Sequence, residues 1–446
     1  MQQFNAAATP DAAQIAPETR QATKPLTHGD KHIWGIYLAL LFVSVVELYS
    51  ASSREVASSA MGVFGPLVRH VGQLAIGFLI VLGLQRTHYR NFYSISLLFV
   101  FISVILMIWC LIGGEIVNGA RRAVNLVVMK VQPSEFIKLS AVFLTAFIAQ
   151  RTQIKGGGIS NAGAATMAAF VLFFCALLIK QGLTNTVLLM AISLSMFLIG
   201  GMQWKKIFLI LMIYALCGGV FFLLTKMGDD DDKPAVEQVD GSNIDEANAT
   251  AGQRHGTWGA RLERYFGDGR PKYEHEINAT NRQEMYAYMA QANGGIVGVG
   301  PGNSRETARL PLAFSDYIYS IIVEDTGLIG GLLLMVAYLW LLMRAAAIAS
   351  RCTRAFPALL VLGMAVMIVL QALFHMAIVT GTGPVSGQPL PLISKGGTSI
   401  LVTSIAFGVM LSVSRYTARS GKRQDVKREL EALPDDLMTE NPTQLK

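Results

Sequence analysis

One carboxylate, Asp316, lies where a long polar stretch ends and the eighth apolar segment begins. At a membrane, the low dielectric raises the pKa of a carboxyl group, so that the group can act as a base at neutral pH. The pair Ser315–Asp316 ahead of an apolar run is also a common helix N-cap, which satisfies free N–H groups of the first turn. Caps are common and catalytic acids are rare, so this stretch alone favours the cap.

A second charged pair, Glu135 and Lys138, is spaced i, i+3 and therefore shares one face of a helix. Ionisable groups inside a membrane are costly, and they usually face a cavity or each other. Two interpretations follow from this spacing. The pair holds helices together as a buried ion pair, or Lys138 binds a diphosphate that Glu135 helps to position.

Arg121, Arg122 and Lys130 lie in a short loop predicted on the outer face of the membrane. Lys and Arg normally gather in cytoplasmic loops, so this loop breaks the positive-inside rule. Its cations either face an anion, such as a phosphate bound through charge-assisted hydrogen bonds, or are a tolerated exception.

The composition identifies a membrane protein. The chain has 446 residues, of which 52% are hydrophobic and 15% charged, whereas soluble proteins carry about 25% charged residues. The formal net charge of +7 is spread over short loops, and this argues against a nucleic acid partner. The four cysteines lie in or beside apolar segments without metal-ligand spacing, so they are interpreted as small hydrophobic residues.

About ten segments have the roughly 20 apolar residues that a membrane span needs. They begin near Ile33, Val71, Tyr93, Glu135, Ala164, Thr186, Ile207, Asp316, Phe356 and Thr398. The alternation of Lys and Arg between loops predicts that both termini are cytoplasmic. Residues 1–32 lack the pattern of a cleavable signal peptide, so the first segment is expected to be an uncleaved anchor.

The predicted fold is all-α, with a cytoplasmic tail at 1–32, a membrane domain at 33–416 and a second cytoplasmic tail at 417–446. A large extracytoplasmic loop at 228–315 joins the seventh and eighth helices. Its first part, 228–255, is acidic and is interpreted as a mobile insertion. An interfacial helix is expected around Trp258–Phe266, and an amphipathic helix at Gln283–Ala292.

The large loop ends in the glycine-rich stretch Gly294–Gly302, which is not a dinucleotide-binding loop because no strand precedes it. It would allow close approach of the backbone to a ligand or to another helix.

The stretch Gly381–Ser399 is too rich in proline and glycine for a helix and too apolar for a free loop. Such backbone near a membrane must be buried in protein or line a cavity. A plain tight connection with turn residues is the alternative, and the length and apolar content of the stretch favour the cavity. His375, just before it, is interpreted as a packing histidine and not as a metal ligand, since no partner has metal spacing.

Three separated stretches together resemble a known family. They are Gly119–Lys138 with Gln-Pro-Ser-Glu-x-x-Lys, the glycine-rich stretch through Asp316, and Leu390–Ser399 with Pro-Leu-x-x-Ser-x-Gly-Gly. The combination is similar to the SEDS (shape, elongation, division, sporulation) family of bacterial envelope proteins, whose members include FtsW and RodA. The resemblance covers about residues 33–416, without the tails and the acidic insertion.

This resemblance implies a ten-helix glycosyltransferase that polymerises lipid II into the glycan strands of peptidoglycan, with undecaprenyl diphosphate as leaving group. It makes Asp316 the general base and so reverses the preference for the cap. One carboxylate suffices for an inverting transfer. The family's remaining motif residues are the candidates for substrate binding: Arg121, Arg122, Gln132, Ser134, Glu135, Lys138, Asn303, Ser304, Ser394, Gly396, Gly397 and Thr398.

The resemblance also implies partners and a location. The expected partners are lipid II, the undecaprenyl-diphosphate-linked glycan, a class B penicillin-binding protein (an FtsI-like transpeptidase) and other division proteins. The expected location is the septum, in the bacterial cytoplasmic membrane. No cofactor is required by the sequence, although Mg²⁺ or Mn²⁺ could shield the diphosphate.

The chain departs from the family pattern at Ala123, at Lys395, at His375 and over Gln181–Thr186, where other residues are usual. Glu324 and Asp325 are assigned to structure, and Glu47 has no assigned role. Three alternatives stay open: a lipid II flippase without catalysis, a scaffold that recruits the transpeptidase, and a RodA-like polymerase of elongation. The extended tails favour division.

Overall fold

The computed structural model describes residues 29–51, 64–117, 120–125, 130–154, 158–179, 181–228, 276–277, 281–307, 309–310, 313–383 and 386–417. The predicted interfacial helix around Trp258–Phe266, the acidic insertion beyond residue 228 and most of both predicted tails lie outside these residues.

Ten long helices account for the ten predicted segments, in the predicted order. They are α1 (Lys31–Ala51), α3 (Phe64–Leu84), α4 (Tyr89–Gly113), α5 (Pro133–Thr152), α6 (Asn161–Ile179), α7 (Leu183–Ile199), α8 (Trp204–Gly228), α11 (Ile318–Ala349), α12 (Ala355–Val379) and α13 (Gly397–Thr417). Among the described residues, seven of these are long and apolar enough to cross a membrane, and α7 is apolar but shorter. The chain is therefore a multi-pass helical membrane protein, as predicted.

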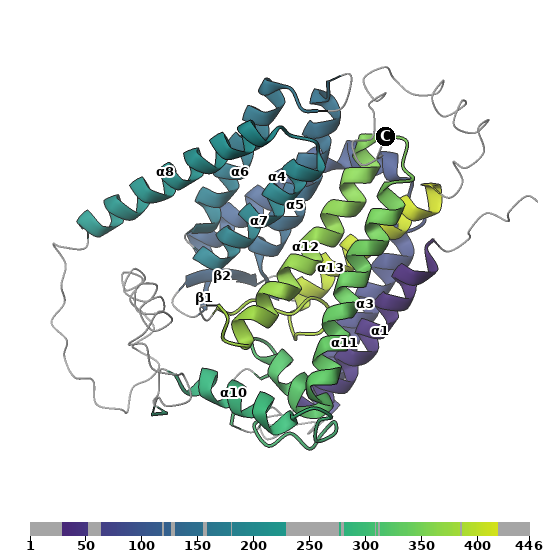
Figure 1. Ribbon diagram of the computed structural model, residues 1–446, viewed down its shortest axis with the longest axis vertical. Helices are drawn as coiled ribbons and strands as arrows, with labels where there is room; N and C mark the ends of the chain where they lie inside the picture. The colour runs from purple at the N-terminus through teal and green to yellow at the C-terminus, as the bar shows by residue number, and fades with distance from the viewer. Residues whose placement is uncertain are drawn as a thin grey trace, which may run out of the picture.

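The helices differ in how much of their surface other helices cover. Almost every residue of α5 and α12 is buried, and α11, α12 and α13 lie side by side in Figure 1. In contrast, α8 diverges from the bundle, and apolar side chains such as Phe208 and Leu216 are exposed. Apolar side chains on an uncovered helix suit contact with lipid.

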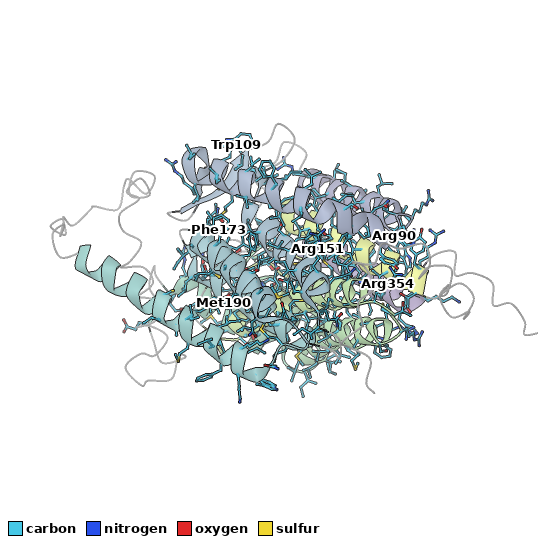
Figure 2. All side chains as sticks on the ribbon, turned by 90° about the horizontal axis from the view of Figure 1, so that it is seen from above. Arg90, Trp109, Arg151, Phe173, Met190 and Arg354 are labelled. Carbon is cyan, nitrogen blue, oxygen red and sulfur yellow. The ribbon has the colours of Figure 1, made fainter. Side chains whose placement is uncertain are left out.

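Basic side chains mark one end of the bundle. Arg90 begins α4, Arg151 lies at the end of α5, and Arg354 precedes α12. Figure 2 shows these three toward one end, away from Trp109 near the other end of α4. This arrangement agrees with the predicted alternation of basic loops.

A small antiparallel sheet follows α4 and was not predicted, since the sequence analysis treated this region as a loop. Its strands are β1 (Glu115–Val117), β2 (Ala120–Asn125) and β3 (Lys130–Val131), in the order β1-β2-β3. Lys130 forms an ion pair of 2.7 Å with Glu115 across the sheet. The anion that this outer cation faces is thus supplied by the chain itself.

The glycine-rich stretch after α10 (Arg282–Gly294) binds the backbone of a broken helix. Helix α11 is interrupted at Gly327, whose φ is 73°. There the N–H groups of Val299 and Gly300 donate to the carbonyls of Glu324 and Asp325, at 2.9 Å each. On the other side of the break, the Leu328 N–H donates to the Gly295 carbonyl at 3.0 Å. Of the two predicted uses of this stretch, close approach to a helix is the one observed.

Residues 386–396, called the inner loop below, form an irregular segment between α12 and α13 that is mostly buried. Four of its backbone carbonyls accept hydrogen bonds from side chains of three helices. The pairs are Gln388 with His375 (2.6 Å), Pro389 with Gln371 (3.3 Å), Pro391 with Tyr338 (2.6 Å) and Ile393 with Ser44 (3.3 Å). The prediction that protein encloses this backbone is confirmed, and the plain tight connection is wrong.

Candidate active site

Asp316 does not cap the helix that follows it. The N-cap residue of α11 is Tyr317, and no side-chain hydrogen bond caps this end. The Asp316 carboxylate instead accepts a hydrogen bond of 2.9 Å from the neighbouring Ser315 hydroxyl. The residue as a whole is half-buried.

The inner loop holds the segment that carries Asp316 at two places. The Ser394 hydroxyl donates to the Ser315 carbonyl at 2.8 Å, and the Lys395 N–H donates to the Phe314 carbonyl at 2.9 Å. At its other end the loop passes directly against the carboxylate, because a Cβ built on Gly387 would lie 2.8 Å from Asp316 Oδ2. The inner loop therefore holds the backbone just before Asp316 and lies beside its carboxylate.

The environment of Asp316 favours a basic carboxylate. Burial raises the pKa of Asp316 above the ordinary value of an aspartate. The hydrogen bond from Ser315 and the positive charge of Arg122 act in the opposite direction without cancelling this effect. A carboxylate with a raised pKa is a stronger base and remains usable near neutral pH.

The two predicted arginines have different surroundings. Both lie on β2, where the pairing with β1 is irregular and Arg122 falls between the paired positions Arg121 and Ala123. Arg121 donates to the carbonyls of Leu111 and Ile112 in the last turn of α4, a favourable place for a cation. Arg122 donates to the Gln181 carbonyl at 3.0 Å, and its charge acts on Asp316. Only Arg122 is thus linked electrostatically to the candidate base.

Glu135 and Lys138 form the predicted pair, with 2.7 Å between Lys138 Nζ and Glu135 Oε1. Both side chains are buried, and Lys138 also donates to Gln371 Oε1 at 3.1 Å. The amide of Gln371 in turn donates to the Pro389 carbonyl of the inner loop. The observed contacts match the helix-tying interpretation, and they connect the ion pair to the loop that supports Asp316.

The other candidates at the start of α5 and α13 lie close to one another. The Gln132 N–H donates to the Thr398 hydroxyl at 3.0 Å, and this hydroxyl donates to the Lys130 carbonyl at 3.1 Å. The buried hydroxyl of Ser134 has no hydrogen-bond partner among the residues that the structure describes. Gly396 accepts the first hydrogen bond of α13, from Ile400, and Gly397 begins that helix.

Asn303 and Ser304 belong to a different cluster. The Ser304 hydroxyl donates to Glu324, which also accepts from the Arg305 N–H at 3.0 Å and from Asn293 at 3.3 Å. Glu324 is eight positions after Asp316, on the order of 10 Å along a helix. These contacts support the structural assignment of Glu324. They hold Ser304 beside the break in α11, apart from the carboxylate of Asp316.

Two further acids, Glu47 and Asp325, approach each other where α1 meets the broken helix. Their charges interact, and the Ser50 hydroxyl donates to Asp325. Among the described residues, no group of three His, Cys, Asp or Glu side chains could hold a metal ion.

Sequence reasoning missed several residues that shape the surroundings of Asp316. Gln371 was not singled out, although a glutamine inside a hydrophobic helix predicts a polar partner. Gly387, Gln388 and Asn185 were not assigned roles either. Their importance depends on contacts between segments up to 203 positions apart, for which a single sequence gives no signal.

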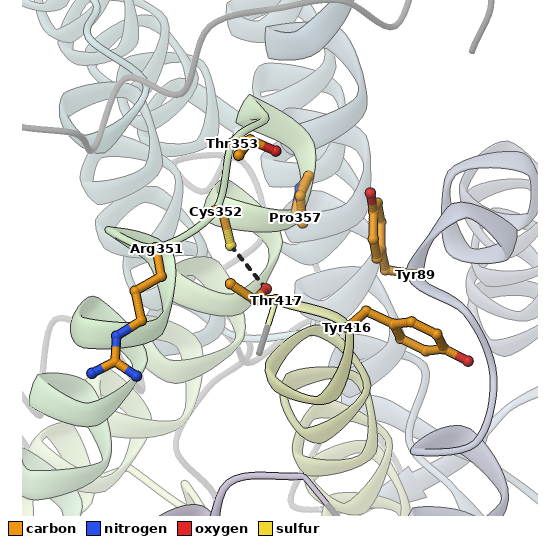
Figure 3. Close-up of a pocket in the computed structure, with 7 residues that line it drawn as sticks. All are labelled: Tyr89, Arg351, Cys352, Thr353, Pro357, Tyr416 and Thr417. Carbon is orange, nitrogen blue, oxygen red and sulfur yellow. Dashed lines mark hydrogen bonds between the residues drawn. The ribbon is translucent and has the colours of Figure 1, made fainter. Parts of the chain in front are cut away.

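A small pocket at the opposite end of α11 is a poor candidate for catalysis. Its lining includes Cys352 and Thr417, whose side chains share a hydrogen bond of 3.5 Å (Figure 3). Burial raises the pKa of Cys352 to about 11, although the Thr417 hydrogen bond acts against this. The thiol therefore stays protonated near neutral pH and is a weak nucleophile.

Comparisons with known proteins show which family the chain matches. Residues 30–233 and 273–419 match the cell cycle protein family of FtsW, RodA and SpoVE. A probable peptidoglycan glycosyltransferase FtsW of Dichelobacter nodosus is 29% identical over 397 residues, covering 86% of this chain and 90% of the relative. The peptidoglycan glycosyltransferase MrdB of Escherichia coli is 26% identical over 395 residues, covering 87% and 94%.

One solved structure, from work on how a peptidoglycan synthase complex coordinates polymerization and crosslinking, has a similar fold. The TM-score is 0.61 at 22% identity, over 88% of this chain and 99% of the other.

The buried pair Glu135–Lys138 gives a prediction that distinguishes a role in stabilising the fold from a role in binding substrate. Lys138→Met leaves an unpaired buried carboxylate, so we expect it to lower the free energy of unfolding by about 3–5 kcal/mol. The double variant Lys138→Met with Glu135→Leu removes both charges and should recover most of this loss. Thermal unfolding in detergent measures both effects. Equal stability of wild type and Lys138→Met would contradict the tying role.

Proposed function

Because the chain belongs to the cell cycle protein family of FtsW, RodA and SpoVE and is a peptidoglycan glycosyltransferase, we propose that it polymerises lipid II into glycan strands. The observation that carries the proposed mechanism is the place of Asp316. The residue is half-buried, its carboxylate does not cap a helix, and the inner loop lies beside it.

In the proposed reaction, Asp316 accepts the proton of the 4-hydroxyl of one lipid II. The oxygen then forms a bond to the anomeric carbon of the growing strand, and the bond from that carbon to undecaprenyl diphosphate breaks. The diphosphate leaves with the electron pair of the broken bond. General-base catalysis of this kind contributes about 10²–10⁴-fold to the rate.

Arg122 is the cation that we assign to the leaving diphosphate. A guanidinium can donate two parallel hydrogen bonds to phosphate oxygens. The interaction of its charge with Asp316 supports a position near the reacting groups. Arg121 is a weaker candidate, because its guanidinium donates to the carbonyls at the end of α4.

Inversion at the anomeric carbon is the stereochemical outcome that we propose. A retaining enzyme needs a second carboxylate about 5–5.5 Å from the first, to act as nucleophile. The next acids in the sequence, Glu324 and Asp325, lie in α11, about 9 Å or more along the helix from its first residue Ile318. Glu324 is held by three hydrogen bonds, and Asp325 accepts one from Ser50. A direct displacement with Asp316 as the single base fits this arrangement.

Replacement of Asp316 tests the mechanism. Asp316→Asn keeps the size of the side chain but removes the base, so we expect glycan-strand formation to fall about 10²–10⁴-fold. The measurement is polymerisation of purified lipid II by the full chain together with its transpeptidase, with thermal unfolding as the control for folding. Equal polymer from wild type and variant would show that the base is another residue. If neither forms polymer while lipid II crosses a vesicle bilayer, the flippase is the better account.

The pH dependence of the rate is a second test. The base must be ionised, so the rate should fall as the pH is lowered through the pKa of Asp316. Burial raises that pKa above the ordinary 3.8, and the midpoint of the acid limb should therefore lie above 3.8. Initial rates of polymerisation across the acid range measure it, with the stability of the protein checked at each pH. An acid limb at or below 3.8 would contradict the assignment.

We further propose that the protein acts in division, with both termini in the cytoplasm and a class B penicillin-binding protein as its partner. The similar fold in a synthase complex for polymerization and crosslinking supports such a partner, and the tails at 1–32 and 417–446 support the division role. The chain should copurify with an FtsI-like transpeptidase and restore septation in cells depleted of FtsW. Restoration of rod shape in cells depleted of RodA, without septation, would assign it to elongation.

A further inference from the structure

Gly387 lies so near Asp316, 71 positions away in the sequence, that the space between them would not hold a Cβ atom. A Cβ at position 387 would lie 2.8 Å from Asp316 Oδ2 and 3.3 Å from its Cγ. Cβ atoms in folded proteins essentially never approach a neighbour below 3.0 Å. The φ of Gly387 is outside the left-handed region, so its backbone would accept an alanine. A larger residue at position 387 would therefore displace the Asp316 carboxylate, while the backbone conformation of Gly387 does not itself require glycine.

The residue after Gly387 is fixed from two helices. His375 Nδ1 of α12 lies 2.6 Å from the Gln388 carbonyl, and because a carbonyl only accepts, this nitrogen carries the proton. The Gln388 side chain donates to Asn185 Oδ1 in the first turn of α7, at 3.0 Å. All three side chains are buried. We call Asn185, Gln388 and His375 the clamp.

The clamp determines where Gly387 lies. Consecutive Cα atoms are held about 3.8 Å apart by the planar peptide, so fixing the backbone of Gln388 restricts the position of Gly387. Gly387 itself is exposed, and a Cβ on it would enter the space that the Asp316 carboxylate occupies. A displacement of the clamp would therefore also move Gly387, which is one peptide unit away from Gln388 and lies beside the Asp316 carboxylate.

We propose that Asn185, Gln388 and His375 are positioning residues for the transfer reaction, which act by holding Gly387 against the Asp316 carboxylate. This inference rests on the proposed role of Asp316 as base. None of the clamp residues touches the reacting atoms. They restrict the orientation of the carboxylate toward the acceptor hydroxyl, and an error of about 1 Å in such an orientation can cost about 10²-fold in rate.

Two matched pairs of variants test the proposal in the full-length protein with its transpeptidase and lipid II. Gly387→Ala places a methyl group against Asp316, whereas Gly383→Ala places one in ordinary contact, 3.6 Å from Ile378, in the same connection between helices. His375→Leu removes the donor to Gln388, whereas His375→Asn retains an N–H at the place of Nδ1, since Asn Nδ2 and His Nδ1 are the same number of bonds from the backbone.

We expect Gly387→Ala to lower kcat about 100-fold with little change in KM, and Gly383→Ala to behave as wild type. His375→Leu should lower kcat about tenfold and move the acid limb of the pH–rate profile to lower pH, because a less enclosed Asp316 gains solvent. His375→Asn should restore both. Arg122 is the charged group that acts on Asp316 and is unchanged in all four variants.

The possible outcomes separate this inference from the proposed function. If wild type polymerises lipid II and Gly387→Ala does so at the same kcat, the positioning role is wrong while the function stands. If His375→Leu and His375→Asn lose activity equally, or lose it only in proportion to a loss of thermal stability, the clamp is merely structural. If wild type forms no polymer, the proposed function fails, and the positioning role fails with it.

Discussion

Backbone without helix or strand hydrogen bonds is costly inside a membrane, because no water is present to satisfy its N–H and C=O groups. The inner loop places such backbone among α1, α11 and α12, and each of these helices contributes polar side chains to it. This one requirement explains polar residues that are otherwise unexpected in apolar helices. The buried side chains of Tyr338, Ser44 and His375 form hydrogen bonds with carbonyl groups of the inner loop. The inner loop that they hold in turn supports the segment that carries Asp316.

The need to satisfy the buried backbone of the inner loop also explains the buried charges of Glu135 and Lys138 without a substrate. A lysine inside a membrane is usually interpreted as a binding group, yet the ammonium of Lys138 donates to Glu135 and Gln371. Gln371 then donates to Pro389 of the inner loop. Removing one member of such a network leaves a buried polar group unsatisfied, so its effect reaches residues that it does not touch. Loss of activity on mutation of Lys138 is therefore insufficient evidence of contact with a diphosphate.

The sequence was sufficient to predict the ten helices, because membrane spans follow from length and apolarity alone. It also predicted the contact between Glu135 and Lys138, because i, i+3 spacing is a local property. It did not reveal that β2 is a strand, and so it grouped Arg121 with Arg122, although Arg121 donates to the end of α4 and Arg122 to Gln181. The contacts of Gly387 and Gln388 were equally out of reach, since they depend on how α7, α12 and the inner loop pack together.

Asp316 lies between two breaks in regular structure. This arrangement allows the carboxylate to be held rigidly in a protein whose membrane helices can tilt and slide. On one side is the inner loop, and on the other is the short first part of α11, which ends at Gly327. That part does not depend on the long remainder of α11, because other elements hold it. Gln291 of α10 donates to Ser320 and to the end of α12 at Val379, and the glycine-rich stretch binds the carbonyls before the break.

A carboxylate at the end of an uninterrupted membrane helix would move whenever that helix tilts or slides. A carboxylate on a short segment with independent supports can keep its orientation while the membrane helices around it move.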